Sequence, residues 1–258
     1  MNGISAWVRR LSPWLLPAAT LAAWFWAAKL GWISARVFPA PWEVWDAAFK
    51  LAASGALAEH LGISAARAAV GFAIGGGLGF ALGLANGLFP LAERLLDTSV
   101  QMIRNIPHLA LIPLVILWFG IDETAKVFLV TLGVFFPIYA NTFHGVRTVD
   151  RQLLEMGRVY GLGGFGLFRA VVFPAALPSI LVGVRYALGF MWLTLIVAET
   201  IATTSGIGYL AMSAREFMQT DVVVLAILLY ALLGKAADAL ARGLERRWLR
   251  WHPSYQAE

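Results

Sequence analysis

Polar side chains inside apolar segments are the residues of this chain whose types and spacing suggest chemistry. Glu199 ends a long apolar stretch, and Thr203 follows one helical turn later, on the same face of a continued helix. Polar groups are costly inside a membrane and are often functional there, so both residues are candidates for lining or gating a pore. A hydrogen bond between helices, or a position at the outer interface, would explain Glu199 equally well.

Two further pairs of polar residues are each spaced by three positions. Asn105 and His108 begin one apolar segment, and Asn141 and His144 end another. Both pairs are candidates for a translocation path or an inner gate. Packing or interface hydrogen bonds are an equal explanation for each pair.

Other kinds of site are excluded or are not indicated. The chain has no Cys, so thiol catalysis and Cys-based metal sites are impossible. Its four His residues lie at unlike positions and predict no metal site. Arg104 and Arg185 could border an inner path for anions, or could only anchor their helices at the membrane surface.

The composition indicates a chain that faces lipid. Of its 258 residues, 60% are hydrophobic and only 14% are charged, whereas soluble domains carry about 25% charged residues. The net charge is +5, but the basic residues stand singly between apolar runs. That distribution is typical of topology signals, so we expect a lipid bilayer and no nucleic acid as a partner.

Six apolar segments are long enough to cross a bilayer as helices. They are residues 11–33, 68–92, 105–121, 127–146, 179–203 and 221–241. Helices are expected because lipid offers no partners to backbone polar groups, and none of the segments alternates as a barrel strand does. The sequence therefore predicts an all-α integral membrane protein with six transmembrane helices, forming one transmembrane domain over 1–258 with its core over 61–245.

Basic residues set the expected orientation. With the N-terminus inside, most Arg residues fall on inner segments, whereas only a few Lys and Arg residues border the outer side. The positive-inside rule therefore predicts a multi-pass protein with both termini in the cytoplasm.

The longest inner segment, residues 147–178, has its own pattern. Arg151 to Tyr160 is charged on one side and apolar on the other, and Gly161 can end that helix with a positive φ. Residues 167–173 predict a second short helix, and Pro174 marks the return to the membrane. We expect a helix–turn–helix on the inner face, too short and too polar to span.

Glycine recurs every fourth residue in the second apolar segment, at Gly71, Gly75, Gly79, Gly83 and Gly87. Such a ridge of small residues predicts close packing between membrane helices. The Gly-rich stretch lacks the Lys-Ser/Thr pair of a phosphate-binding loop, so no ATP or other cofactor is expected in this chain.

The inner loop resembles the EAA motif of ABC importer permeases. That motif reads Glu-Ala-Ala, three residues, Gly, nine residues, Ile, one residue, Leu-Pro. The spacing matches at every position, through Glu155, Met156, Gly157, Gly161, Val171, Phe173 and Pro174. The departures are Met and Gly for the two Ala, Val for Ile and Phe for Leu, and they approximately keep size or apolarity.

Segments 99–122, 135–151 and 196–221 resemble the permease subfamily for sulfonates, taurine and nitrate-type anions. The resemblance implies a type I permease fold and no enzyme activity. It also implies a bacterial inner-membrane subunit that moves aliphatic sulfonates by alternating access. Taurine, nitrate or a similar small solute is the alternative substrate, and a secondary transporter is the rival class. That class would need inverted repeats and a paired ion site, which the sequence does not show clearly.

The resemblance also implies partners for the chain. These are a second permease copy, a dimer of ABC ATPases that binds ATP and Mg, and an extracytoplasmic substrate-binding protein. The coupling residues to the ATPase would then be Glu155, Met156, Gly157, Gly161 and Pro174.

Overall fold

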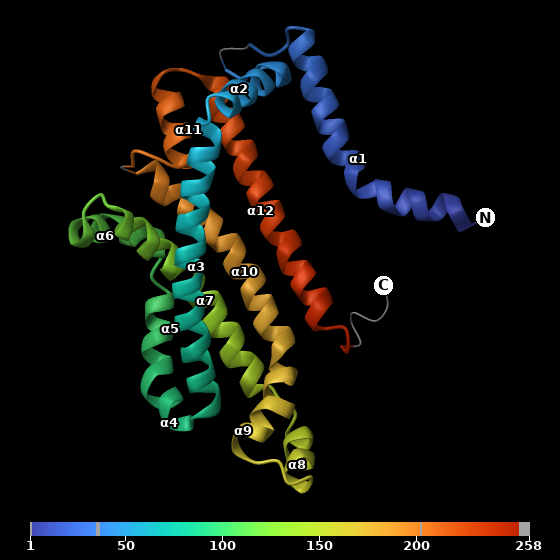
Figure 1. The fold of residues 1–258 in the computed structure, drawn as a ribbon, viewed down its shortest axis with the longest axis vertical. Coiled ribbons are helices and arrows are strands. Elements are labelled where there is room, and N and C mark those ends of the chain that lie inside the picture. Colours follow the sequence, from blue (N-terminus) through green and yellow to red (C-terminus); the bar gives the residue numbers. More distant parts are fainter. Residues whose placement is uncertain (1, 35–36, 202, 253–258) are drawn as a thin grey trace. The chain divides into compact units, whose positions relative to one another are not determined.

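The computed structural model describes residues 2–34, 37–201 and 203–252, and over these ranges it is helical, without a β-strand. The predicted all-α class is confirmed. Two π-helical turns, Glu93–Asp97 and Phe168–Val172, and a 3₁₀ turn, His108–Leu111, connect some of the α-helices. Those helices (Figure 1) are α1 (Asn2–Lys29), α2 (Pro41–Ala53), α3 (Ala56–Leu88), α4 (Pro90–Ala92), α5 (Thr98–Arg104), α6 (Ile112–Phe119), α7 (Glu123–Arg147), α8 (Arg151–Val159), α9 (Gly164–Leu167), α10 (Phe173–Thr200), α11 (Ile207–Glu216) and α12 (Thr220–Trp248).

The chain separates into two compact units. Unit 1 takes in the chain up to His60 together with Leu210–Leu229, and its core is Val44, Ala47 and Leu225. Its helix α2 begins at a proline, which suits the first helical turn, and the Glu43 carboxylate accepts a 2.7 Å hydrogen bond from the Ala40 backbone N–H.

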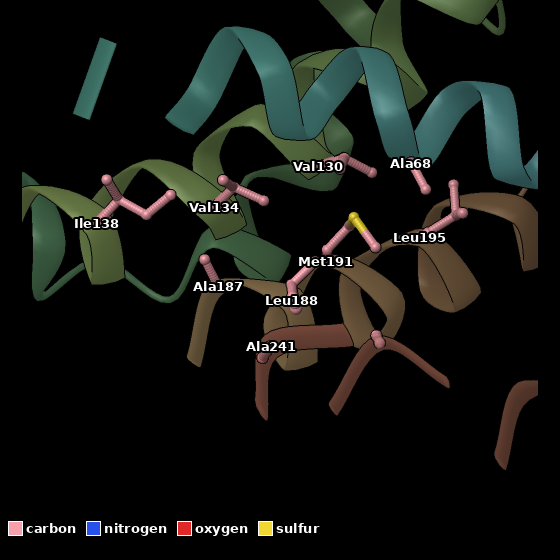
Figure 2. Packing of buried hydrophobic residues seen from close by; sticks show 10 residues of the cluster. Ala68, Val130, Val134, Ile138, Ala187, Leu188, Met191, Leu195 and Ala241 are labelled. Atoms are coloured by element: carbon pink, nitrogen blue, oxygen red, sulfur yellow. The ribbon is translucent and has the colours of Figure 1, made fainter. Parts of the chain in front are cut away.

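Unit 2, Leu61–Tyr209 and the chain from Tyr230 onward, contains the larger core. Figure 2 shows its centre, where side chains of α3, α7, α10 and α12 point toward one another. Val130 and Val134 of α7 and Leu195 of α10 are fully buried there. The labelled residues are Ala68, Val130, Val134, Ile138, Ala187, Leu188, Met191, Leu195 and Ala241.

The glycine ridge of α3 lies directly against α7, as predicted. A Cβ atom added at Gly79 would lie 2.5 Å from the Phe135 carbonyl oxygen, and one at Gly87 would lie 2.7 Å from Val146 Cβ. Real Cβ atoms do not approach other atoms so closely, so only glycine permits this contact. Because residue numbers rise together on both helices, α3 and α7 run parallel.

Helix α10 runs antiparallel to α7. A Cβ at Gly133 would meet the Thr194 hydroxyl at 2.6 Å, whereas one at Gly145 would meet the Ala176 carbonyl at 2.9 Å. Since α3 and α7 are parallel, the chain between them must return from the Leu88 end to the Glu123 end.

The returning segment contains the third span predicted over 105–121, which Pro107 and Pro113 are predicted to distort. It consists of two helical arms, Pro90–Arg104 and His108–Phe119, bent by 81°. The sequence predicts a distortion from its prolines but not its extent. Pro107 has φ −58° and ψ 110°, and a proline disfavours helical geometry in the residue before it, so the helix stops at Arg104.

Among the described residues, four helices are long and apolar enough to cross a membrane, or five if the bent pair is counted as one span. They are α3, α7, the helix Gly164–Thr200 and α12. The first predicted span falls on α1, which is not in this set. The count of six spans, and the single domain with its core over 61–245, therefore stay predictions.

Candidate functional site

The loop between α7 and α10 folds as a helix, a turn and a second helix. Asp150 precedes α8, and its carboxylate accepts a 2.8 Å hydrogen bond from the Gln152 N–H. At the other end, Gly161 has φ +80°, as predicted. The Gly161 N–H donates to the Arg158 carbonyl and the Leu162 N–H to the Gly157 carbonyl, each at 2.9 Å. These two bonds form a Schellman motif, which needs the left-handed residue that glycine supplies.

Gly157 holds the two short helices together. It is buried, and a Cβ at this position would lie 2.6 Å from Leu167 Cδ1 and 3.3 Å from Val171 Cγ2. Leu154 packs on the neighbouring cluster around Val146 and Val172, at the ends of α7 and of the π-helical turn. The hairpin is therefore fixed to the helices on either side of it.

Part of the apolar surface of α8 is not covered by the rest of the described chain. Val159 is 86% exposed and Met156 50% exposed. Glu155, directly before Met156 in the sequence, is also exposed. The hairpin thus presents an apolar surface with one acidic group on it.

The sequence predicts that Pro174 separates a short helix from the membrane span, but the helix continues through it. The separate short helix expected over 167–173 is absent, because α9, the π-helical turn Phe168–Val172 and α10 form one continuous helix, Gly164–Thr200. Pro174 lies in the first turn of α10, directly after the π-helical turn. A proline ring clashes with the carbonyl four residues earlier in an α-helix, and the wider turn relieves that clash.

His108 and Asn141, two of the predicted path residues, line one cavity of about 360 Å³. Arg104 lines the same cavity, together with aromatic and apolar side chains that include Tyr186 and Phe190. The His108 Nε2 atom lies 3.1 Å from the hydroxyl of buried Thr194. The Asn141 amide donates a 2.8 Å hydrogen bond to the Pro137 carbonyl, which fixes its orientation.

The other members of the two predicted pairs lie elsewhere. Asn105 is exposed at the C-terminal cap of α5, and His144 is exposed near the end of α7. Neither residue lines the cavity of His108 and Asn141. The spacing of three positions therefore does not bring both members of either pair to the same site.

A second cavity, of about 600 Å³, adjoins the first and shares Tyr186 and Phe190 with it. Arg185 and Asp238 both line it, and the Arg185 Nε atom donates to the Asp238 carboxylate at 3.0 Å. Asp238 also accepts from Arg242. The second cavity therefore contains a carboxylate, whereas an arginine is the only charged residue lining the first among the described residues.

Glu199 is fully buried, and its carboxylate is surrounded by donors. The Ser64 hydroxyl and Arg67 Nη1 donate to it at 2.8 Å, and the Gly208 N–H and Tyr230 hydroxyl donate at 3.0 Å. A buried carboxylate needs such compensation because removal from water is costly. With its oxygens occupied in this way, Glu199 fits the interhelical alternative, and its pore role stays a prediction.

The sequence places Arg67 and Lys126 at the outer border of their spans as topology signals, but both are buried ion-pair partners. Arg67 Nη2 lies 2.6 Å from the Glu123 carboxylate, and Lys126 Nζ lies 3.1 Å from it. Glu123 itself is 57% exposed. The ion cluster (Arg67, Glu123, Lys126, Glu199) thus joins α3, α7 and α10 at the end opposite the hairpin (Figure 1).

Thr203 does not share a helical face with Glu199, because α10 ends at Thr200. Its hydroxyl instead donates to the Ser205 carbonyl at 2.8 Å, and that carbonyl also accepts from Arg67 Nη1 at 2.7 Å. The chain turns back at Gly206, where φ is +107°. Thr203 therefore stabilises the turn whose Ser205 carbonyl binds Arg67 of the ion cluster.

Comparison with known proteins gives a consistent result. The family model of binding-protein-dependent transport system inner membrane components matches residues 75–250. An aliphatic sulfonates transport permease protein, SsuC, of Escherichia coli is 64% identical over 98% of this chain and 96% of its own length. The SsuC protein of Bacillus subtilis is 46% identical over 97% of this chain and 90% of its own length.

More distant proteins share the fold or part of the sequence. The taurine transport system permease protein TauC of Escherichia coli is 34% identical over 93% of this chain and 89% of its own length. A solved structure of the MetNI methionine ABC transporter, in an inward-facing conformation, has a TM-score of 0.51. The two sequences are 20% identical, and the superposition covers 73% of this chain and 94% of the MetNI chain. The likeness is therefore one of fold alone. This chain belongs to the family of binding-protein-dependent transport system inner membrane components, the permease subunits of ABC transporters.

Proposed function

We propose that this chain is the transmembrane subunit of an ATP-driven importer of aliphatic sulfonates in the bacterial inner membrane. Two copies would form the pathway, and a dimer of ABC ATPases would bind ATP and Mg on the cytoplasmic side. A binding protein would deliver the sulfonate from outside. Family membership and the names of the two SsuC relatives support this proposal.

The hairpin α8–α9 is the observation that carries the coupling role. Its exposed apolar side chains and Glu155 form a surface that a partner protein could cover. Glu155 would pair with a basic residue of the ATPase, and Met156, Gly157, Gly161 and Pro174 would shape the contact. ATP binding would close the ATPases, bring the two hairpins together and open the outer cavity.

The helix directions support the proposed topology. Parallel α3 and α7 with antiparallel α10 require the bent pair to return between them, so we count it as one span. If α1 is counted as a further span, the number of crossings is six, and we propose that both termini lie in the cytoplasm with the hairpin. The Arg-rich end of α12, with Arg246 and Arg247, agrees with a cytoplasmic position.

The coupling role is tested with Glu155→Gln and Gly161→Ala in vesicles that contain the whole transporter. We expect each variant to lower sulfonate uptake per ATP hydrolysed, or to lose the ATPase during purification. Alanine at Gly161 would be strained because φ there is +80°. Glu59→Gln, an exposed acid at the start of α3, is the control. Normal uptake and assembly in both hairpin variants would refute the coupling role.

The substrate is tested by uptake of labelled ethanesulfonate, taurine and nitrate by the same vesicles. We expect ATP-dependent uptake of the sulfonate to be fastest. Faster uptake of taurine or nitrate would reassign the substrate within the family. Uptake against a gradient by the permease alone would instead favour a secondary transporter.

A further inference from the structure

The two adjoining cavities differ in charge, and the difference determines where an anion can be held. In the smaller cavity Arg104 lies with His108 and Asn141, and no acidic residue lines that cavity among the described residues. In the larger cavity Asp238 lies beside Arg185 and accepts a hydrogen bond from it. In the larger cavity the Arg185 guanidinium is already engaged with Asp238, so its charge is offset by that carboxylate and fewer of its N–H groups are left for a sulfonate.

Of the two arginines that line these cavities, Arg104 is the one whose donors are available. It is exposed, and it makes no ion pair with any carboxylate in the described ranges, whereas Arg185 and Arg242 both pair with Asp238. A guanidinium can bind two oxygens of an oxyanion at once through its fork of N–H groups. A sulfonate head group has three such oxygens, so one arginine can hold it firmly.

The neighbouring polar groups are held in place by the protein itself. His108 Nε2 is engaged with Thr194 Oγ1 at 3.1 Å, which leaves the other ring nitrogen for a ligand. Asn141 packs against Gly183, where a Cβ would lie 2.7 Å from the Asn141 Cβ, so its side chain has little freedom to move. Tyr186 and Phe190 are 60% and 42% exposed and separate the two cavities.

We propose that the cavity of Arg104, His108 and Asn141 is the site that holds the anionic head group during transport, with the alkyl chain against Phe190 and Tyr186. This inference rests on the proposed function, and it assigns substrate selection within the membrane to Arg104. The volume of about 360 Å³ accepts a small alkanesulfonate, because small-molecule sites begin at roughly 300 Å³.

The test uses vesicles with the complete transporter and saturating binding protein, and measures the rate of labelled ethanesulfonate uptake. Arg104→Gln is expected to lower that rate about tenfold or more, the size of a lost charge-assisted bidentate contact. Arg104→Lys is expected to recover part of the rate. Arg147→Gln is the control, because Arg147 is exposed, pairs with Glu93 and lines neither cavity.

The amount of ATPase that co-purifies with the permease shows whether a variant still assembles. This amount should be equal in the wild type and in all three variants. A wild-type rate in Arg104→Gln would overturn the inference. So would a larger loss in Arg185→Gln than in Arg104→Gln, since it would place the anion in the other cavity. A wild-type transporter that moves no sulfonate would instead overturn the proposed function, and the inference with it.

The apolar half of the site has its own test. Phe190→Ala enlarges the space beside the chain, so uptake should shift toward longer alkanesulfonates. The expected change in the ratio of hexanesulfonate to ethanesulfonate uptake is roughly fourfold for each additional methylene group buried. An unchanged ratio would show that the chain does not lie against Phe190.

Discussion

Replacement of Gly79 by alanine tests the packing of α3 on α7 most directly. The added Cβ would lie 2.5 Å from the Phe135 carbonyl oxygen and 3.2 Å from the Tyr139 nitrogen. Both are backbone atoms of α7, so no side chain can rotate away to make room. To restore an ordinary contact the two helices must separate locally by roughly 1 Å, in an interior that is already close-packed.

The expected cost is that of overpacking, about 1–3 kcal/mol of unfolding free energy. Gly77 provides the matched control, because it lies on the same helix and a Cβ there would meet nothing within 4 Å. Alanine at Gly77 is expected to be neutral or to stabilise by about 0.5–1 kcal/mol, since glycine is the poorer helix former. Only Gly79→Ala should therefore destabilise the protein, although the substitution is the same at both positions.

Thermal unfolding of the purified permease in detergent, followed by loss of the monodisperse species, measures both variants. At roughly 2–4 °C per kcal/mol for a chain of this size class, Gly79→Ala should lower Tm by several degrees. Gly77→Ala should leave Tm unchanged or raise it slightly. If Gly79→Ala were as stable as Gly77→Ala, α3 and α7 would not be in backbone contact at this position.

Two further predictions concern the ion cluster and the hairpin. Glu199→Gln should lower Tm more than Glu123→Gln, because Glu199 is fully buried whereas Glu123 is 57% exposed and its charge is partly screened by water. A larger decrease in Tm for Glu123→Gln would contradict the expectation that the buried Arg67–Glu199 pair contributes more to stability. Gly157→Val should reduce recovery of the ATPase with the permease several-fold, because the first added atom would lie 2.6 Å from Leu167 Cδ1. Gly163→Ala, where a Cβ meets nothing within 4 Å, should recover as much ATPase as the wild type, and equal recovery for all three proteins would contradict a role of the α8–α9 contact.

Local patterns predict much of the fold. The four-residue spacing of glycines indicates the contact of α3 with another helix, since the spacing places small residues on one face. The end of α8 at Gly161 is also predictable, because the turn there depends only on residues that are near in the sequence. The 81° bend is not predictable in extent, although Pro107 signals a break, because the angle depends on how both arms pack.

The polar sites were harder to predict because their partners are distant in sequence. Arg67 pairs with Glu123 and Glu199, which lie 56 and 132 residues away, so neither pairing follows from local spacing. The one available signal is that Arg67 directly precedes a long apolar segment. The prediction that Thr203 shares a helical face with Glu199 is wrong because the helix ends at Thr200 and a turn with Gly206 follows, whereas the apolar stretch suggests a longer helix.

Backbone contact between α3 and α7 also limits how the molecule can change shape. Two helices joined through glycines along most of their length cannot slide past each other, since each step would drive a carbonyl into the opposite main chain. Only three residues separate the end of α7 at Arg147 from the start of α8 at Arg151. A displacement of the hairpin should therefore move α3 and α7 together, as one rigid body, up to the end that carries Glu123.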